Sequence, residues 1–371
     1  MRGRLLVAAL ALVLVAPVFA APPSVTGRAW LVENGATGEV LLAHDARQRV
    51  PIASITKLMT VLLTLEHARL NDVVTVAPQA ASVGESSANL EPGERLTVRE
   101  LLEAALIQSA NDAADALADY VGHGNQARFV AMMNARARQL GLRDTHYVRP
   151  DGLDAEGHFS SAHDVTLLAR VLMHRPVVRQ IVRRRSAVIA TGTLHTWNDL
   201  LYSYPGIYGV KTGHTSAAGW SEVAAARRKG VSIYATLIGS PDRGRRNGDL
   251  TRLLDWGFSQ YVRSRPVVKG RAYAEAKLAY GRDELKLVAA ASLAAPLRAG
   301  RPVVRKIVFP DVVPLPVSRG QSLGQVRIYQ RGRLVGAVPL VASRSVKRPG
   351  MAGRVGWYAG RTLHHMVGWF S

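Results

Sequence analysis

The chain contains no cysteine and has few acidic residues. Without cysteine it forms no disulfide, so packed apolar cores must stabilise it. Its 371 residues include 27 Asp and Glu against 48 Lys and Arg, which gives a formal net charge of +21 at pH 7. Such an excess predicts attraction to polyanions. No zinc-finger, RNP or basic-helix pattern accompanies the charge. An anionic membrane or cell wall therefore fits it as well as nucleic acid does.

Lysine is also scarce. Only 8 of the 48 basic residues are Lys, and the first 268 positions hold just Lys57, Lys211 and Lys229. Arginine supplies positive charge elsewhere, but it cannot give up its proton in a protein, whereas a partly buried Lys can. Lys57 lies in the apolar, helix-forming stretch PIASITKLMT. We interpret it as a position that needs an amine rather than a charge.

The first twenty residues, MRGRLLVAALALVLVAPVFA, have the pattern of a secretory signal. Arg2 and Arg4 precede an apolar run that begins at Leu5, and small residues precede a predicted cleavage after Ala20. An uncleaved anchor is the alternative, although the run is short for a spanning helix. In both cases the remainder is predicted to be exported, to the outer, periplasmic face of the cytoplasmic membrane. The positive charge is then better matched to envelope anions than to nucleic acid.

Length and hydrophobic periodicity predict two domains and a terminal helix. Strands over residues 28–46 and 207–240, with helical patterns between them, predict an α+β domain over 24–265, in which helices flank an antiparallel sheet. Short alternating runs punctuated by Gly and Pro predict a small β-rich domain over 266–345. Residues 350–371 have an apolar and a basic face, typical of a helix that lies in a membrane interface. A helix packed on the protein itself is the alternative.

Ser54 and Lys57 have the spacing S-x-x-K. On a helix, positions i and i+3 share a face about one turn apart, so the hydroxyl and the amine can touch. Serine is a poor nucleophile without an adjacent base. An apolar pocket and a second cation both lower the pKa of a lysine, which can then accept the serine proton. Taken alone, the pattern is weak, because a helix-terminal Ser beside a solvated Lys produces it often.

Two further motifs strengthen this interpretation. Residues 109–111, Ser-Ala-Asn, interrupt a helical pattern and so present a hydroxyl and an amide to a cleft. Residues 211–213, Lys-Thr-Gly, lie on a predicted strand and offer a second cation, a hydroxyl for an anion, and room for an extended substrate. A surface turn and a strand end would explain each motif alone. The three together, in this order, are the set of penicillin-binding proteins and class A β-lactamases.

The chain resembles the serine-type D-alanyl-D-alanine carboxypeptidases, the low-molecular-mass penicillin-binding proteins. The resemblance covers residues 28–265 and extends in plan to the β-rich domain and the tail. It is carried by PIASITKLMT, IQSANDAAD and YGVKTGHTSAAGWS, with LEPGERLTVRELL and LLDWGF between and after them. It implies a β-lactamase/transpeptidase-like fold and removal of the terminal D-Ala from peptidoglycan stem pentapeptides. It also implies covalent inhibition by β-lactams, membrane association through the C-terminal helix, and no cofactor or metal.

The resemblance also implies roles for individual residues. Ser54 would be the nucleophile that forms an acyl-enzyme with the penultimate D-Ala, and Lys57 the base that activates it. Ser109 and Asn111 would pass the proton to the leaving D-Ala and hold the peptide. We expect these four side chains to be catalytic.

Five neighbouring positions would bind substrate. Lys211 would tune the potential of the site and, with Thr212 and Thr215, attract the terminal carboxylate. Gly213 would leave space for the extended peptide. The backbone N–H of His214, together with that of the nucleophile, would form the oxyanion hole.

Departures and alternatives limit this interpretation. Trp197 precedes Asn198 where some relatives have Arg, which puts one route of carboxylate recognition in doubt. A class A β-lactamase needs a Glu between the second and third motifs, but between residues 112 and 210 only Glu156 is present, in a different context. Transpeptidase or endopeptidase activity on the same cross-links stays open. A non-catalytic scaffold that binds the wall is opposed by the intact motifs.

Overall fold

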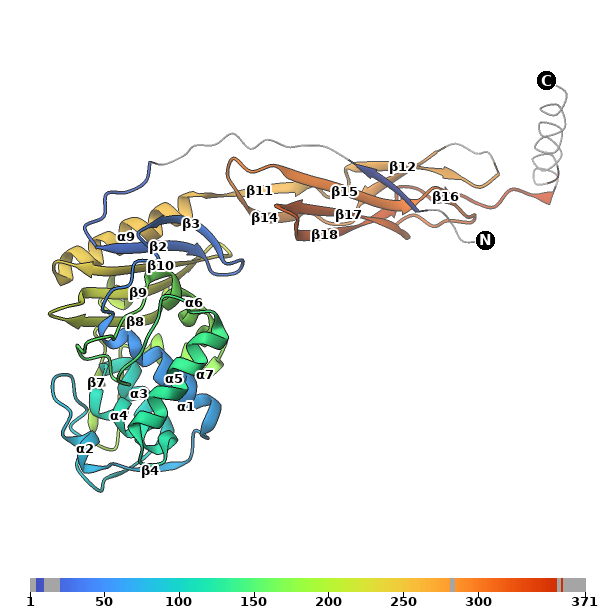
Figure 1. Cartoon of the computed structure of the whole chain (residues 1–371). Coiled ribbons are helices and arrows are strands. Elements are labelled where there is room, and N and C mark those ends of the chain that lie inside the picture. Colours follow the sequence, from blue (N-terminus) through green and yellow to red (C-terminus); the bar gives the residue numbers. More distant parts are fainter. Residues whose placement is uncertain (1–4, 10–20, 281–283, 352–354, 356–371) are drawn as a thin grey trace. The chain divides into compact units, whose positions relative to one another are not determined.

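The computed structural model describes residues 5–9, 21–280, 284–351 and 355, which fall into two compact units (Figure 1). The larger unit comprises residues 20–259, and a β-rich unit combines residues 260–371 with the N-terminal 1–19. The predicted α+β class, with a second β-rich domain, is confirmed. The predicted C-terminal helix lies almost entirely outside the described residues. Among the described residues, no helix has the length and apolarity needed to cross a bilayer.

A five-stranded antiparallel sheet forms the centre of the larger unit. Its strand order is β3 (Glu39–His44), β2 (Ala29–Asn34), β10 (Val231–Ser240), β9 (Gly219–Arg228) and β8 (Ile207–Thr215). Strands from the beginning of the unit therefore pair with strands from its end, because β2 lies directly beside β10. The sequence pattern predicted this arrangement.

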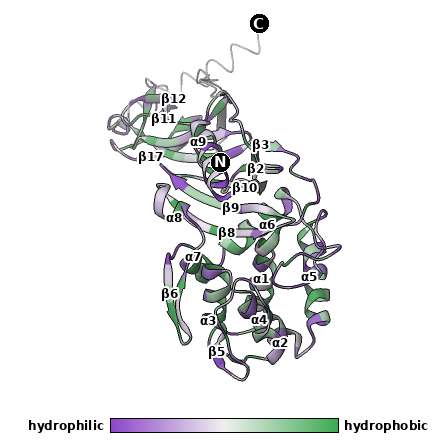
Figure 2. Ribbon diagram, turned by 90° about the vertical axis from the view of Figure 1, so that its left-hand side faces the viewer, coloured by the Kyte–Doolittle hydropathy of each residue, from purple (hydrophilic) through white to green (hydrophobic). Residues whose placement is uncertain are grey.

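Helices cover both faces of this sheet. On one face, Gly257 of α9 (Arg243–Ser259) packs against Val32 and Ile233. On the other, Thr166 of α6 (Ala162–Met173) hydrogen-bonds through Oγ1 to the Thr236 hydroxyl at 2.5 Å. Residues 233 and 236 point to opposite faces because side chains alternate along a strand. Every residue of β2 is accordingly buried, and Figure 2 shows hydrophobic residues along both strands and helices.

The helices begin and end where the sequence supplies capping residues. Thr97 and Glu100 form a capping box, and Ser161 accepts a hydrogen bond from the Asp164 backbone N–H. Gly141 ends its helix in the left-handed conformation.

The remaining helices of this unit are α1 (Lys57–His67), α2 (Pro78–Ala81), α3 (Val98–Glu103), α4 (Asn111–Gly122), α5 (Gln126–Leu140), α7 (Pro176–Val182) and α8 (Leu200–Ser203). Two small hairpins pair β4 (Val73–Thr75) with β5 (Arg95–Thr97), and β6 (Ser186–Ile189) with β7 (Gly192–His195).

The β-rich unit has its own apolar core, which includes Leu285, Val326 and Leu340. Its main sheet has the order β1-β15-β17-β18-β13-β12-β16, and β11 pairs with β14. The strand β1 (Leu5–Ala9) belongs to the predicted signal and lies antiparallel to β15. Cleavage of the signal after Ala20 stays a prediction. The other strands are β11 (Tyr261–Val267), β12 (Ala272–Leu278), β13 (Leu285–Ala289), β14 (Leu293–Arg298), β15 (Val303–Pro310), β16 (Val312–Val313), β17 (Ser322–Gln330) and β18 (Arg333–Ala342).

Candidate active site

Ser54 lies in a 3₁₀ turn, Ala53–Thr56, that leads into the buried helix α1. Two glycines allow the chain to close around this turn. A Cβ on Gly152, whose φ is +88°, would lie 2.1 Å from the Ala53 carbonyl oxygen, and one on Gly213 would lie 2.9 Å from that of Ile52. The Ser54 turn is therefore held between the loop that contains Gly152 and strand β8. Ser54 is half-buried and lines a cleft of about 330 Å³.

Lys57 is fully buried, one helical turn from Ser54, with its amine directed into polar acceptors. Its Nζ donates to Ser54 Oγ at 2.9 Å, to Asn111 Oδ1 at 2.6 Å and to the Asp151 carbonyl oxygen at 2.7 Å. Burial lowers the pKa of Lys57 to about 8, although the charges of nearby aspartates oppose this. The amine is thus fixed against the serine hydroxyl and loses its proton far more readily than an exposed lysine.

The second motif interrupts the helical segment at the predicted place. A π-helical turn, Ala104–Gln108, ends at Ser109, whose φ of 66° is left-handed. The break points the Ser109 hydroxyl at strand β8, where it accepts a hydrogen bond from Lys211 Nζ at 2.7 Å. Lys211 is 2% exposed, and burial, followed by repulsion from Lys57, places its pKa well below the ordinary lysine value. Lys57 and Lys211, two of the three lysines in the first 268 positions, therefore lie in one site.

Asn111 begins α4 and ties the motif to a loop on the cleft rim. Its Oδ1 accepts from Lys57, while its Nδ2 donates to the Gly84 carbonyl at 2.9 Å. Its backbone N–H donates to the Ser86 carbonyl at 2.7 Å. Glu85 and Ser86 line the cleft together with Ser54, Ser109 and Asn111. The loop, the second motif and the lysine thus form one hydrogen-bonded wall.

Strand β8 supplies the opposite wall through Thr212, Gly213 and His214. The exposed His214 ring contacts the Trp220 ring at a tilt of 32°, with 4.1 Å between the ring centroids. The structure adds a contact for Gly213 and one for Thr215, while their predicted substrate-binding roles stay predictions. Gly213 lets β8 approach the Ser54 turn, which is a packing reason for glycine rather than open space. Among the described residues, the cleft lining does not include Thr215, whose hydroxyl donates to Asp154 Oδ1 at 2.6 Å.

The sequence did not single out Arg246, which also lines the cleft and is 1% exposed. Its Nε lies 3.3 Å from Glu222 Oε2, and its Nη2 donates to Asn247 Oδ1 at 2.7 Å. Burial raises the pKa of Glu222 to about 7. In the sequence, Arg246 stands in the basic run RGRRNGD, where no feature separates it from the exposed Arg245. Only the placement of α9 beside β9 identifies it.

Known proteins share this arrangement. The family described as D-alanyl-D-alanine carboxypeptidase, peptidase S11, matches residues 16–242. The chain belongs to this family. The C-terminal domain of penicillin-binding protein 5 matches residues 261–348, so the assignment extends to the β-rich unit.

Three of the relatives compared below cover 85% or more of this S11 enzyme, and a fourth covers about two thirds of it. The carboxypeptidase DacF of Bacillus subtilis is 32% identical over 85% of this chain and 84% of its own. DacC of Escherichia coli is 31% identical over 94% of this chain and 92% of its own. Penicillin-binding protein 5 from Haemophilus influenzae superimposes with a TM-score of 0.65, at 26% identity, over 89% of this chain and all of its own. The Streptomyces K15 DD-transpeptidase superimposes with a TM-score of 0.62, at 31% identity, over 65% of this chain and all of its own.

Glu156 lies away from the nucleophile. It lines a separate cavity of about 320 Å³ with Gly152, Asp154 and His158, and this cavity shares no lining residue with the Ser54 cleft. Glu156 is therefore not placed to activate water at Ser54, as the Glu of class A β-lactamases does. Among the described residues, no group of acidic or histidine side chains has the arrangement of a metal site.

Proposed function

We propose that this S11 enzyme removes the terminal D-Ala from peptidoglycan stem pentapeptides through an acyl-enzyme on Ser54. The observation that carries the proposal is the hydrogen bond between the fully buried Lys57 amine and the half-buried Ser54 hydroxyl, inside a cleft walled by the other two motifs. A serine next to a lysine that gives up its proton readily is an activated nucleophile.

In the acylation step, neutral Lys57 accepts the Ser54 Oγ proton while Oγ attacks the carbonyl carbon of the penultimate D-Ala. The peptide C–N bond then breaks, and the leaving amine of the terminal D-Ala needs one proton. Ser109 is suited to deliver it, because its hydroxyl bonds to Lys211 and faces the same cleft. The proton that Lys57 took from Ser54 then replaces the one that Ser109 gave up, which returns Lys57 to the free base for the second step. We assign the oxyanion hole to the backbone N–H groups of Ser54 and His214.

Recognition of the terminal carboxylate is assigned to Arg246, Lys211 and Thr212. Arg246 compensates for Trp197, which stands where some relatives have an arginine. Its Nε and Nη2 both donate to Asn247 Oδ1, and Nη2 also donates to Asp199 Oδ2. No hydrogen bond joins Nη1 to the residues that the structure describes, so we assign Nη1 to a ligand in the cleft. Lys211 adds a buried amine next to Thr212 on strand β8. A substrate with a free C-terminal carboxylate suits this end of the cleft.

In the second step, a water molecule attacks the ester carbonyl, and Lys57 is positioned to accept its proton. An amine from a neighbouring stem peptide would give transpeptidation instead. That alternative is kept because a solved relative of 31% identity is a DD-transpeptidase. The predicted signal and the basic, amphipathic residues 350–371 support action outside the cytoplasmic membrane, attached to its surface.

Incubation of the purified enzyme with a stem pentapeptide should release free D-Ala, and labelled penicillin should acylate Ser54. Ser54→Ala should abolish both reactions while leaving the melting temperature close to that of the wild type, since the side chain is only half-buried. Label on Ser109, or release of D-Ala by Ser54→Ala, would overturn the assignment of the nucleophile. If a dimeric product forms when an acceptor peptide is added, the transpeptidase alternative is supported.

A further inference from the structure

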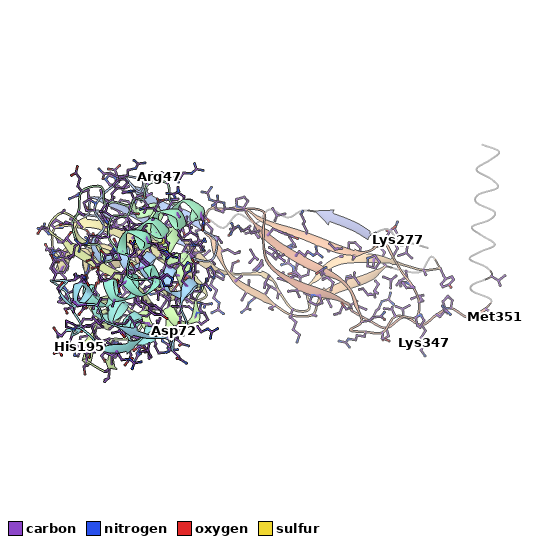
Figure 3. The ribbon with its side chains drawn as sticks, turned by 60° about the horizontal axis from the view of Figure 1, so that its bottom comes forward. Arg47, Asp72, His195, Lys277, Lys347 and Met351 are labelled. Carbon is purple, nitrogen blue, oxygen red and sulfur yellow. The ribbon has the colours of Figure 1, made fainter. Side chains whose placement is uncertain are left out.

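Two tryptophan side chains line the Ser54 cleft, and no step of the proposed reaction uses either of them. The chain has six Trp in 371 residues, and Trp197 and Trp220 both contribute to this one cleft. Trp220 stands on β9, with the His214 ring against it. Trp197 follows β7 by two residues, and Figure 3 shows His195, the last residue of β7, at the surface of the larger unit. The cleft therefore has an aromatic lining in addition to the polar residues of the three motifs.

Core packing does not explain Trp197. Trp30 and Trp256 are 9% and 8% exposed, so they fill the interior of the larger unit, whereas Trp197 is 45% exposed. An indole that remains in water gains nothing from the hydrophobic effect. Tryptophan is also one of the residues that most often anchor a binding surface. The exposed indole is therefore better explained by contact with a ligand than by folding.

The position of Trp197 is fixed although it is exposed. On one side of it the Thr196 backbone N–H donates to the Arg185 carbonyl at 2.9 Å, and on the other the Asn198 backbone N–H donates to Thr196 Oγ1 at 3.1 Å. The Arg243 guanidinium lies over the indole, 5.2 Å from the ring centroid. A cation over an aromatic face is attracted to it and so restrains the ring. The indole is therefore an ordered apolar surface in the lining of the cleft.

A network of contacts joins this indole to Arg246. Arg243 binds both oxygens of the Asp199 carboxylate, and its Nε donates at 2.7 Å. The same carboxylate accepts from Arg246 Nη2 at 3.4 Å and from Asn247 Nδ2 at 2.8 Å. Arg246 in turn lies over the Trp220 ring, 5.7 Å from its centroid. Both tryptophans are therefore held by cations of one network, which is centred on Asp199.

This network determines which part of a substrate would meet the indole. In the proposed function, Arg246 binds the carboxylate of the terminal residue, and the side chain of that residue is attached to the same α-carbon. The cleft measures only about 330 Å³, so a side chain bound beside Arg246 also reaches Trp197. A flat apolar wall favours an apolar side chain. The methyl group of D-Ala would cover a small part of an indole, whereas a larger apolar side chain would bury more of it.

We propose that Trp197 is a specificity-determining residue that receives the side chain of the departing D-amino acid, so that the enzyme also releases larger apolar D-residues from stem peptides. The inference rests on the proposed function. The bond changes are those of the acylation step: the Ser54 ester forms, the peptide C–N bond breaks, and the leaving amine takes one proton. Only the departing amino acid differs, with D-Leu, for example, in place of D-Ala.

Three stem pentapeptides that differ only in the terminal residue, Gly, D-Ala or D-Leu, test the proposal with the full-length enzyme. Each methylene group that leaves water for an apolar surface is worth about fourfold in affinity. The wild type should therefore hydrolyse the D-Leu peptide with a kcat/KM roughly tenfold or more above that of the Gly peptide, and D-Ala should lie between them. Trp197→Ala should reduce the ratio of D-Leu to Gly below about threefold. Trp197→Phe, which keeps an aromatic ring, should restore most of the ratio.

Tyr202→Ala is the matched control. Tyr202 is 58% exposed and has the Arg185 guanidinium 4.7 Å from its ring centroid, but it is not among the described residues that line the cleft. Its ratio should stay within about twofold of the wild type. An equal loss for all three peptides in Trp197→Ala would show that the indole only supports the Asp199 network, which would overturn the proposal. Wild-type enzyme that hydrolyses the D-Ala peptide but not the D-Leu peptide would overturn it too, because the indole would then exclude larger side chains.

A binding measurement keeps this inference separate from the proposed function. In Ser54→Ala, which cannot form the ester, calorimetry should give the D-Leu peptide a Kd roughly tenfold or more below that of the Gly peptide. Ser54→Ala combined with Trp197→Ala should lose this difference. Equal dissociation constants for the three peptides in Ser54→Ala would overturn the proposal even if the wild type releases D-Ala. Failure of the wild type to release any terminal residue would count against the proposed function alone, because the affinities are measured without turnover.

Discussion

Lys57 Nζ lies 2.9 Å from Ser54 Oγ although Lys57 has no exposed surface. A buried charge is retained only where its hydrogen bonds are satisfied. The amide of Asn111 and the carbonyl of Asp151 supply the other two acceptors. The lysine is therefore held in one orientation, in which losing its proton converts it directly into a base for the serine.

Lys57→Arg should lower the acylation rate by about 10²- to 10⁴-fold, because arginine keeps the charge but cannot accept a proton. Acylation by labelled penicillin measures the effect. Lys229→Arg, in the exposed turn between β9 and β10, is the matched control and should acylate normally. Substantial acylation by Lys57→Arg would remove the general-base role.

Arg246→Gln should raise KM for a stem pentapeptide by about 10- to 100-fold, the value of a hydrogen bond to a charged group. Arg245→Gln, whose side chain is exposed, serves as the control. A pentapeptide amidated at its C-terminus separates recognition from folding, since it has no carboxylate. Wild type and Arg246→Gln should bind that amide equally, and a further loss on the amide would indicate general damage to the cleft.

Acid should destabilise the larger unit through His158. Burial lowers the pKa of His158 to about 4, against about 6.5 in the unfolded chain. Its Nδ1 accepts from the Val148 N–H, so the neutral ring donates through Nε2 to Thr56 Oγ1 at 2.8 Å. A group with a lowered folded pKa stabilises fully above pH 6.5 and loses its contribution as pH falls to 4, about 3 kcal/mol in all. Urea denaturation between pH 7 and 4 measures it, and His158→Gln should flatten the dependence.

Gly152→Ala should destabilise the protein and impair acylation together. The new Cβ would lie 2.1 Å from the Ala53 carbonyl oxygen, and the left-handed φ of +88° adds strain for any residue with a side chain. The Ser54 turn must then shift. Gly124→Ala, also left-handed but open to solvent, controls for backbone strain alone. Normal acylation by Gly152→Ala would show that the turn tolerates displacement.

Deletion of residues 350–371 should release the enzyme from membranes without lowering pentapeptide hydrolysis. The sequence pattern of this segment, apolar on one face and basic on the other, is the physical reason. Sedimentation with lipid vesicles measures the release. A truncated form that still sediments would place membrane attachment elsewhere in the chain.

The sequence predicted most of the larger unit because its helices carry strong local signals. The break at Ser109 and the ends set by Ser161 and Gly141 occur where capping and turn residues stand. The three motifs could also be placed in one cleft, since their residue types suit one chemistry. The helix ends and the motifs were predictable because each is defined by residues close together in the sequence.

Residues whose importance depends on distant partners were not predictable. Arg246 differs from Arg245 only in facing Glu222 on another element. Asp115 looks like an ordinary polar residue of a helix until the fold buries it and leaves its Oδ2 without a donor among the described residues. Thr215 was expected at the carboxylate, but Asp154 from a loop sixty-one positions away accepts its hydroxyl. Tertiary contact decides each of these cases.

The pairing of β2 with β10 has a consequence for biogenesis. Val32 and Ala235 are register partners, so the central sheet cannot close before about residue 240 has been made. Contacts this distant along a chain slow spontaneous folding. A polypeptide predicted to be exported would remain extended and threadable during synthesis, and its active centre would assemble only after both ends of the larger unit have emerged outside the cell.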